Sequence, residues 1–209
     1  HRRLVLPQLG APGVAAHHVR KGSGFSVVYG PVRACDIRPF LRAGMVATPE
    51  MRRVRFSILD RLRQARVEFV ISLKYLALAA SLFLLLAGLG RAGYSSTSVL
   101  DVGSRSAGNL LLAYLGGVLV GPVFLPWLPG RAFSLKGLVA GLGMFVVSFL
   151  TGLAGHNLLE VVAWAALMPT IASFLTMNFT GASTYTSLSG VKREMRVAVP
   201  LQIAGGLVG

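Results

Sequence analysis

Residues 24–56, GFSVVYGPVRACDIRPFLRAGMVATPEMRRVRF, separate two parts of a 209-residue chain that differ in composition. Before this stretch lies a short sequence typical of a soluble α/β protein. After it the chain carries long apolar segments with few charges. The stretch therefore marks the point at which a predicted soluble part joins a predicted membrane part.

The composition indicates a membrane protein. Hydrophobic residues make up 54% of the chain and charged residues only 13%, whereas soluble domains carry about 25% charged residues. The net charge is +14, and most of the Lys and Arg residues lie before residue 67. Beside a bilayer, such a basic segment usually marks the cytoplasmic flank of the first span. No nucleic-acid-binding motif accompanies it, so nucleic acid is not an expected partner.

Both ends of the chain suggest a fragment of a longer protein. A strand pattern follows His1 directly, and the chain ends in an apolar run at Gly209. No signal peptide pattern precedes residue 67. A single cysteine, Cys35, excludes an internal disulfide and a metal site built only from cysteines.

Two short apolar runs predict parallel strands. Arg2–Leu6 ends at Pro7, and Phe25–Tyr29 ends at Gly30, which is typical of strands buried in a parallel sheet. In doubly wound α/β domains, ligands bind at the carboxyl ends of such strands. The loops 7–13 and 30–34 are therefore the predicted ligand-binding loops.

Three helices are predicted around these strands. Gly13–Lys21 lies between the strands, and Ile37–Arg42 follows Asp36 as a candidate N-cap. The third begins at Thr48 and runs to Arg66, and six arginines but one acid, Asp60, fall between Arg52 and Arg66. This helix is predicted to lie on the cytoplasmic membrane surface, where each arginine gains about 1 kcal/mol from anionic lipid. A solvated linker helix is the alternative.

Five apolar segments predict transmembrane helices, because a bilayer core requires about 20 apolar residues per helix. They cover residues 69–90, 107–128, 137–155, 158–177 and 197–209, with the fifth truncated. Basic residues alternate between the connecting segments, which places the soluble part inside. The predicted fold is thus an α-helical membrane bundle that follows the end of a doubly wound α/β domain (residues 1–47) and the linker helix 48–66.

Few residues in this chain suggest chemistry of their own. Glu160 lies inside a predicted span, where acids often serve function; it either pairs with His156 and water or lines a path for a cation or substrate. Cys35 is a candidate ligand for mercury or cobalt, or a small half-buried residue. His17 and His18 are adjacent, so helix-surface histidines are favoured over a shared metal site.

Glycines recur at four-residue spacing in the predicted spans. The pairs are Gly117 and Gly121, Gly137 and Gly141, and Gly205 and Gly209. This spacing allows close helix approach. We expect it to serve packing within the bundle, with oligomerisation as the alternative. The hydroxyl-rich segment Asn178–Gly190 is predicted to be a loop that caps helices or contacts another domain.

Several of these segments resemble one family. They are LVLPQLGAPGVAAHHV (residues 4–19), GFSVVYGPVRACDIRPFL (24–41), ATPEMRRVRF (47–56), NFTGASTYTSLSGVKREMR (178–196) and PLQIAGG (200–206). Together they resemble the corrinoid protein of bacterial mercury methylation (the HgcA type). That family is related to the large subunit of the corrinoid iron–sulfur protein of the acetyl-CoA pathway, which has no such membrane region.

The resemblance implies a corrinoid-binding domain followed by a membrane domain of five helices. In that family the cobalt of the corrinoid (cobalamin) carries a methyl group and transfers it to Hg(II). A ferredoxin-like protein with two iron–sulfur clusters reduces the cobalt, and the methyl donor comes from the methyltetrahydrofolate pathway. The expected location is the cytoplasmic membrane of a bacterium or archaeon, with the soluble part in the cytoplasm.

The resemblance assigns corrinoid-side positions and no catalytic residue in this chain. The corrinoid-side positions are Gln8, Gly10, Gly13, Gly30, Pro31, Val32, Arg33 and Ala34. The family's cap-helix motif, Asn-[Val/Ile]-Trp-Cys-Ala-[Ala/Gly]-Gly-Lys, has no match here, and Cys35 is not its cysteine. Arg38 and Cys35 depart from the family pattern. The chain alone is therefore expected to be inactive.

Two other functions fit the sequence. A membrane-linked corrinoid methyl carrier of one-carbon metabolism would differ in its methyl acceptor. A membrane transporter or scaffold would not be an enzyme, and it predicts polar residues that face a common path through the spans.

Overall fold

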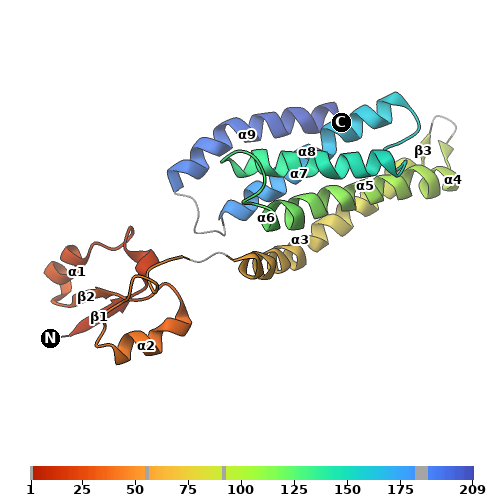
Figure 1. Cartoon of the computed structure of the whole chain (residues 1–209). Helices are drawn as coiled ribbons and strands as arrows, with labels where there is room; N and C mark the ends of the chain where they lie inside the picture. Colours follow the sequence, from red (N-terminus) through yellow and green to blue (C-terminus); the bar gives the residue numbers. More distant parts are fainter. Residues whose placement is uncertain (1, 55–56, 91–92, 182–187) are drawn as a thin grey trace. The chain divides into compact units, whose positions relative to one another are not determined.

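The computed structural model describes residues 2–54, 57–90, 93–181 and 188–209. The chain divides into two compact units, residues 1–55 and 56–209. The first is a small α/β unit and the second is helical (Figure 1). Each unit is described by itself.

The first unit is built on two parallel strands. Strand β1, Arg3–Leu6, pairs with β2, Ser26–Tyr29, and Leu6 lies opposite Tyr29. Helix α1, Ala16–Ser23, connects them and ends at Gly24, whose φ of 73° gives the left-handed C-cap that glycine allows. The predicted strands are confirmed within one residue at their starts, and the predicted helix 13–21 begins later than expected.

Helix α2, Ile37–Arg42, has the predicted bounds, although Asp36 makes no side-chain capping bond. Short 3-10 turns, Gln8–Gly10 and Ala34–Asp36, follow the two strands. The fully buried Phe40 of α2 packs beneath Gly30. A Cβ on Gly30 would lie 3.6 Å from the Phe40 ring and 3.2 Å from Val5. The contact with Phe40 would be an ordinary van der Waals contact, so it is Val5 of β1 that leaves little room for a side chain at Gly30.

The predicted start of the linker helix, at residue 48, is wrong. Residues 49–52 form turns, and helix α3 begins only at Ile58 and continues to Ala87. Ser57 and Asp60 form a capping box, in which Ser57 Oγ accepts from Asp60 N and Asp60 Oδ2 accepts from Ser57 N. This box determines the start of the helix. The basic segment after Ile58 and the first predicted span are thus one helix of 30 residues.

The second unit is a helical bundle. After α3 comes a small antiparallel pair, β3 (Leu89–Gly90) and β4 (Gly93–Tyr94). A continuous helical rod then runs over Ser96–Val123. The rod consists of α4 (Ser96–Ser98), a π-helical segment (Val99–Gly103), α5 (Ser104–Leu115), a second π-helical segment (Gly116–Val120) and α6 (Gly121–Val123).

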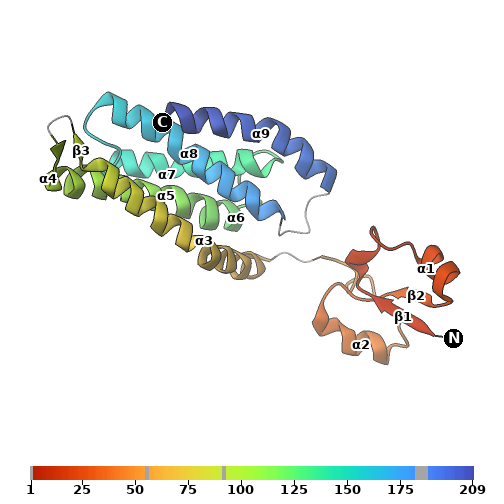
Figure 2. The same ribbon diagram turned by 180° about the vertical axis from the view of Figure 1, so that it is seen from behind.

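Three further helices complete the bundle. They are α7 (Phe133–Leu150), α8 (Leu158–Gly181) and α9 (Leu188–Val208). Figures 1 and 2 show α8 beside α9 from both sides. Of the predicted loop 178–190, the first four residues belong to α8 and the last three to α9. Residues 182–187 lie outside the described residues.

In the described part of the chain, four helices are long and apolar enough to cross a membrane. They are α3, the rod Ser96–Val123, α7, and α8 over Leu158–Phe179. The chain is therefore a multi-pass membrane protein. The predicted fifth span, 197–209, lies in α9, which is not one of the four. Helix α9 begins nine residues earlier than that span and includes the charged residues 192–194 and 196.

The predicted glycine pairs pack against α8. A Cβ on Gly141 of α7 would lie 2.6 Å from Pro169 Cα, and one on Gly117 would lie 2.9 Å from Ala172 O. A Cβ on Gly205 of α9 would lie 2.3 Å from Thr170 Oγ1. Close helix approach within the bundle, the favoured interpretation, is confirmed.

Candidate functional site

The two predicted binding loops leave one edge of the β1–β2 sheet. Because Leu6 lies opposite Tyr29 in a parallel pair, the loops 7–13 and 30–34 begin side by side. Gly30 N donates to Leu6 O at 2.7 Å. Tyr29 Oη donates to Val14 O at 2.5 Å, which ties the end of the first loop to the second strand. The topology therefore starts both loops, which contain the eight positions predicted from the resemblance, at one edge of the sheet.

These positions differ in accessibility. Gly30 and Pro31 are buried, while Gln8, Gly10, Val32 and Arg33 are half-buried. Gly13 and Ala34 are exposed. Gly30 and Pro31 therefore shape the second loop from within. The remaining positions have side chain or backbone that solvent reaches.

A polar cavity of about 230 Å³ opens beside the second loop. Its walls come from both sides of α2 in the sequence: Arg33, Cys35, Asp36, Thr48, Glu50, Met51 and Arg53. Val32 N donates to Met51 O at 2.9 Å, which holds residues 48–53 against the loop. Residues 48–53 were not among the predicted site residues, because Thr48 and Pro49 are typical of a helix start. In the structure, turns over residues 49–52 fold this segment against the loop 30–34 instead.

Cys35 is exposed and lines this cavity, and its Sγ lies 3.8 Å from Asp36 Oδ1. His17 and His18 are exposed on α1, with ring centroids 4.2 Å apart. No group of three or more His, Cys, Asp or Glu residues able to hold a metal ion occurs among the described residues. The cavity offers arginine donors and carboxylate acceptors, which suit the amide and phosphate groups of a polar ligand.

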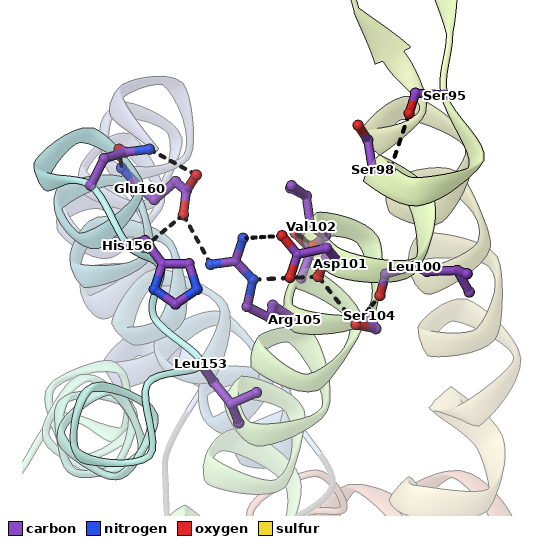
Figure 3. Close-up of polar contacts among 12 residues, drawn as sticks. Ser95, Ser98, Leu100, Asp101, Val102, Ser104, Arg105, Leu153, His156 and Glu160 are labelled. Atoms are coloured by element: carbon purple, nitrogen blue, oxygen red, sulfur yellow. Dashed lines mark hydrogen bonds and ion pairs between the residues drawn. The ribbon is translucent and has the colours of Figure 1, made fainter.

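The second predicted site, around Glu160, lies at the end of the bundle where α5 meets α8. Glu160 Oε2 accepts from Arg105 Nη1 at 3.3 Å and from His156 N at 3.1 Å. Asn157 Nδ2 donates to Glu160 Oε1 at 2.8 Å. Figure 3 shows Arg105 between Glu160 and Asp101, with which it forms a second ion pair at 3.3 Å.

The partner of Glu160 is therefore an arginine of another helix. The predicted pairing of Glu160 with His156 is confirmed in part, because His156 donates its backbone N–H to Glu160 Oε2. Asn157 caps α8, because its Oδ1 accepts from Glu160 N at 2.9 Å. Four hydrogen bonds of Glu160 thus join α5, α8 and the segment before α8 at one end of the bundle. The sequence could not identify Arg105, because 55 residues separate it from Glu160.

Buried polar residues inside the bundle bond to one another. Asn109 and Ser148 are both fully buried, and Ser148 Oγ donates to Asn109 Oδ1 at 2.5 Å. Asn109 Nδ2 donates to Leu153 O at 2.9 Å. Tyr114 Oη donates to Phe69 O at 2.7 Å. These groups bind neighbouring helices together.

Comparison with known proteins gives no relative: no protein-family model, no curated protein and no solved structure matches this chain.

Proposed function

We propose that this chain supplies the membrane anchor and the end of the corrinoid-binding domain in a protein that methylates inorganic mercury(II). The observation that carries the proposal is the placement of the GPVRACDI block. It leaves the same sheet edge as the loop 7–13, in a chain that also has four helices able to span a membrane. The related soluble corrinoid subunit of the acetyl-CoA pathway has no membrane region.

The residues at the sheet edge are suited to the periphery of a corrinoid. Gln8, Arg33 and the accessible backbone of residues 10–13 would hold amide or phosphate groups of the cofactor. A bound corrinoid supplies the cobalt that carries the methyl group. The chain's own part is to position the cofactor edge, and Gly30 and Pro31 fix the loop that does so.

The membrane helices serve as an anchor on this proposal. Glu160, the acid within a predicted span, is bonded to Arg105, and the buried Asn109 and Ser148 are bonded to each other. This pairing favours packing over a polar transport path. A ferredoxin-like protein with two iron–sulfur clusters would reduce the cobalt, and a methyltetrahydrofolate-linked donor would supply the methyl group. A one-carbon carrier with another methyl acceptor is the alternative that shares the same cofactor edge.

The first test is deletion of the gene in its native host, followed by assay of methylmercury from added isotopically enriched Hg(II). We expect production to stop and to return when the intact gene is supplied. Unchanged production in the deletion strain would reject mercury as the acceptor. Loss of growth on one-carbon substrates with methylmercury unaffected would favour the alternative carrier.

The second test addresses the cofactor edge through Arg33. In the complemented strain, Arg33→Ala should lower methylmercury formation about tenfold or more, because a hydrogen bond to a charged group contributes about 1.5–3 kcal/mol. Arg38→Ala is the matched control, since Arg38 is exposed on α2 and does not line the cavity. Equal activity of both variants would remove Arg33 from the binding edge.

A further inference from the structure

Arg61 is a buried cation at the end of the bundle opposite Arg105. It is only 6% exposed, and its Nη1 donates to Val123 O at 2.5 Å. Within the part of the chain that the structure describes, its Nε has no hydrogen-bond partner. None of the ion pairs among the described residues includes Arg61. A buried charge without an opposite charge beside it is costly, so this position calls for a nearby anion.

A second cation, Lys136 of α7, bonds to a carbonyl of the same segment. Lys136 Nζ donates to Leu125 O, two residues after the carbonyl that Arg61 binds. These carbonyls follow the carboxyl end of the helical rod, where the helix dipole contributes a partial charge of about −0.5. That partial charge does not balance two full positive charges. Glu194, which α9 brings to this end, accepts a bond from Ser134 N at 2.6 Å.

The surface beside Arg61 has the character of a lipid–water interface. Trp127 lies over the guanidinium, with 5.5 Å from Arg61 Cζ to the ring centroid, and it is 65% exposed. Phe124, 5.8 Å from Trp127 between ring centroids, is 48% exposed. Exposed aromatic residues of this kind occur at the level of lipid headgroups. Arg61 therefore lies close beneath the surface at headgroup depth.

The charges of the bundle are also unevenly divided between its ends. At the opposite end, Arg105 is paired with both Asp101 and Glu160. The end near Arg61 carries further cations that outnumber its acids Asp60, Glu68 and Glu194: Arg63, Arg66, Arg131, Lys192, Arg193 and Arg196. An anion approaching the bundle is therefore drawn to the Arg61 end.

We propose that Arg61 and Lys136 form a headgroup site for an anionic phospholipid, with Trp127 at its rim. The lipid phosphate accepts hydrogen bonds from the two cations, as guanidinium and ammonium groups bind phosphate. This is a site on the bundle itself. It differs from the diffuse attraction of a basic helix to a membrane surface, because it depends on two named side chains.

Trp127 provides a local reporter. The chain has two tryptophans, and Trp164→Phe removes the one in the core. The full chain with this change is placed in phosphatidylcholine vesicles that contain either brominated phosphatidylglycerol or brominated phosphatidylcholine. Bromine quenches tryptophan fluorescence at short range. We expect half-quenching at about tenfold lower mole fraction of the anionic lipid, given the two cations of the proposed site.

Substitutions separate this site from general surface charge. Arg61→Gln and Lys136→Gln should each weaken the preference for the anionic lipid, and the double variant should reduce it to about twofold or less. Arg61→Lys should retain most of it. Arg63→Gln is the matched control on the same helix, since the Arg63 side chain is 82% exposed. Lys136→Gln leaves the contacts of Arg61 in place, so the test survives if Arg61→Gln fails to fold.

Three outcomes would overturn the proposal. The first is equal quenching by the two brominated lipids. The second is an equal loss of preference in Arg63→Gln and Arg61→Gln, which would indicate diffuse surface attraction. The third is a change in Trp127 emission caused by inorganic phosphate in purely zwitterionic vesicles, which would indicate a site for free phosphate.

Discussion

Asn109 is a fully buried polar residue within the helical bundle. Its side chain is fully buried, accepts from Ser148 and donates to Leu153 O. Inside a bilayer no water replaces these bonds, although interhelical hydrogen bonds contribute only about 0.6 kcal/mol on average. Asn109 joins α5 to the end of α7 through two such bonds, so its loss also leaves a buried hydroxyl and a carbonyl without their partner.

We therefore predict that Asn109→Leu lowers the free energy of unfolding by about 1–3 kcal/mol, the usual cost of unsatisfied buried groups. Thermal unfolding in detergent micelles, followed by circular dichroism, measures the change. Ser81→Ala is the matched control, because Ser81 is exposed on α3 and bonds only to the carbonyl of Ala77. An unchanged melting temperature for Asn109→Leu would contradict the assigned role.

Glu160 shows what a sequence predicts at the residue scale. An acid near the end of a span, close to His156 and Asn157, was expected to find a partner nearby, and two of its bonds are local. The ion pair with Arg105 is not local. Sequence distance carries no information about it, because only helix packing brings α5 beside α8.

At the scale of elements, the second π-helical segment has an identifiable cause. Gly121 N bonds to Gly116 O, one residue further back than in an α-helix. Gly117 O thereby loses its helical donor, and Thr176 Oγ1 of α8 donates to it at 2.9 Å. Pro122, which lacks an N–H, follows directly. The rod continues to Val123 through this altered bonding.

The packing of α7 on α8 gives a prediction at the same scale. Gly141→Ala should lower the free energy of unfolding by about 1–3 kcal/mol, the usual cost of overpacking. A Cβ there would lie 2.6 Å from Pro169 Cα, and this backbone atom has little room to move.

Gly143, two residues further along α7, provides the control. A Cβ on Gly143 meets nothing within 4 Å. Gly143→Ala should therefore be neutral or stabilise by up to about 1 kcal/mol, because alanine is the better helix former. Paired melting curves in one detergent compare the two variants. Equal melting temperatures would show that α7 and α8 are not in close contact at Gly141.

At the scale of the whole molecule, membrane orientation remains a prediction from the basic residues. Cys35, the single cysteine, is exposed in the first unit and reports on it directly. If the soluble part is cytoplasmic, a membrane-impermeant maleimide should label Cys35 only after cells are permeabilised. The reason is that positively charged segments favour the inner side.

The control for this labelling moves the thiol to the other end of the bundle. Cys35→Ser combined with Ser96→Cys places it at an exposed position at the start of α4. This variant should be labelled in intact cells. The reverse labelling pattern for the two proteins would invert the proposed orientation.

The sequence by itself determined the local and compositional features of this protein. Strand and helix patterns predicted β1, β2 and α2 closely, because short-range signals end these elements: Pro7 follows β1, Gly30 follows β2 and Gly44 lies shortly after α2. Apolar length predicted the four membrane helices, since hydrocarbon requires an apolar helix of a certain length. The spacing of Gly137 and Gly141 predicted close packing within the bundle.

Only the tertiary structure decided the relations between distant residues. It folded residues 48–53 against the loop 30–34, which created the polar cavity. It also buried Arg61 beside Val123. Each depends on contacts between segments far apart in the chain, which local patterns do not encode.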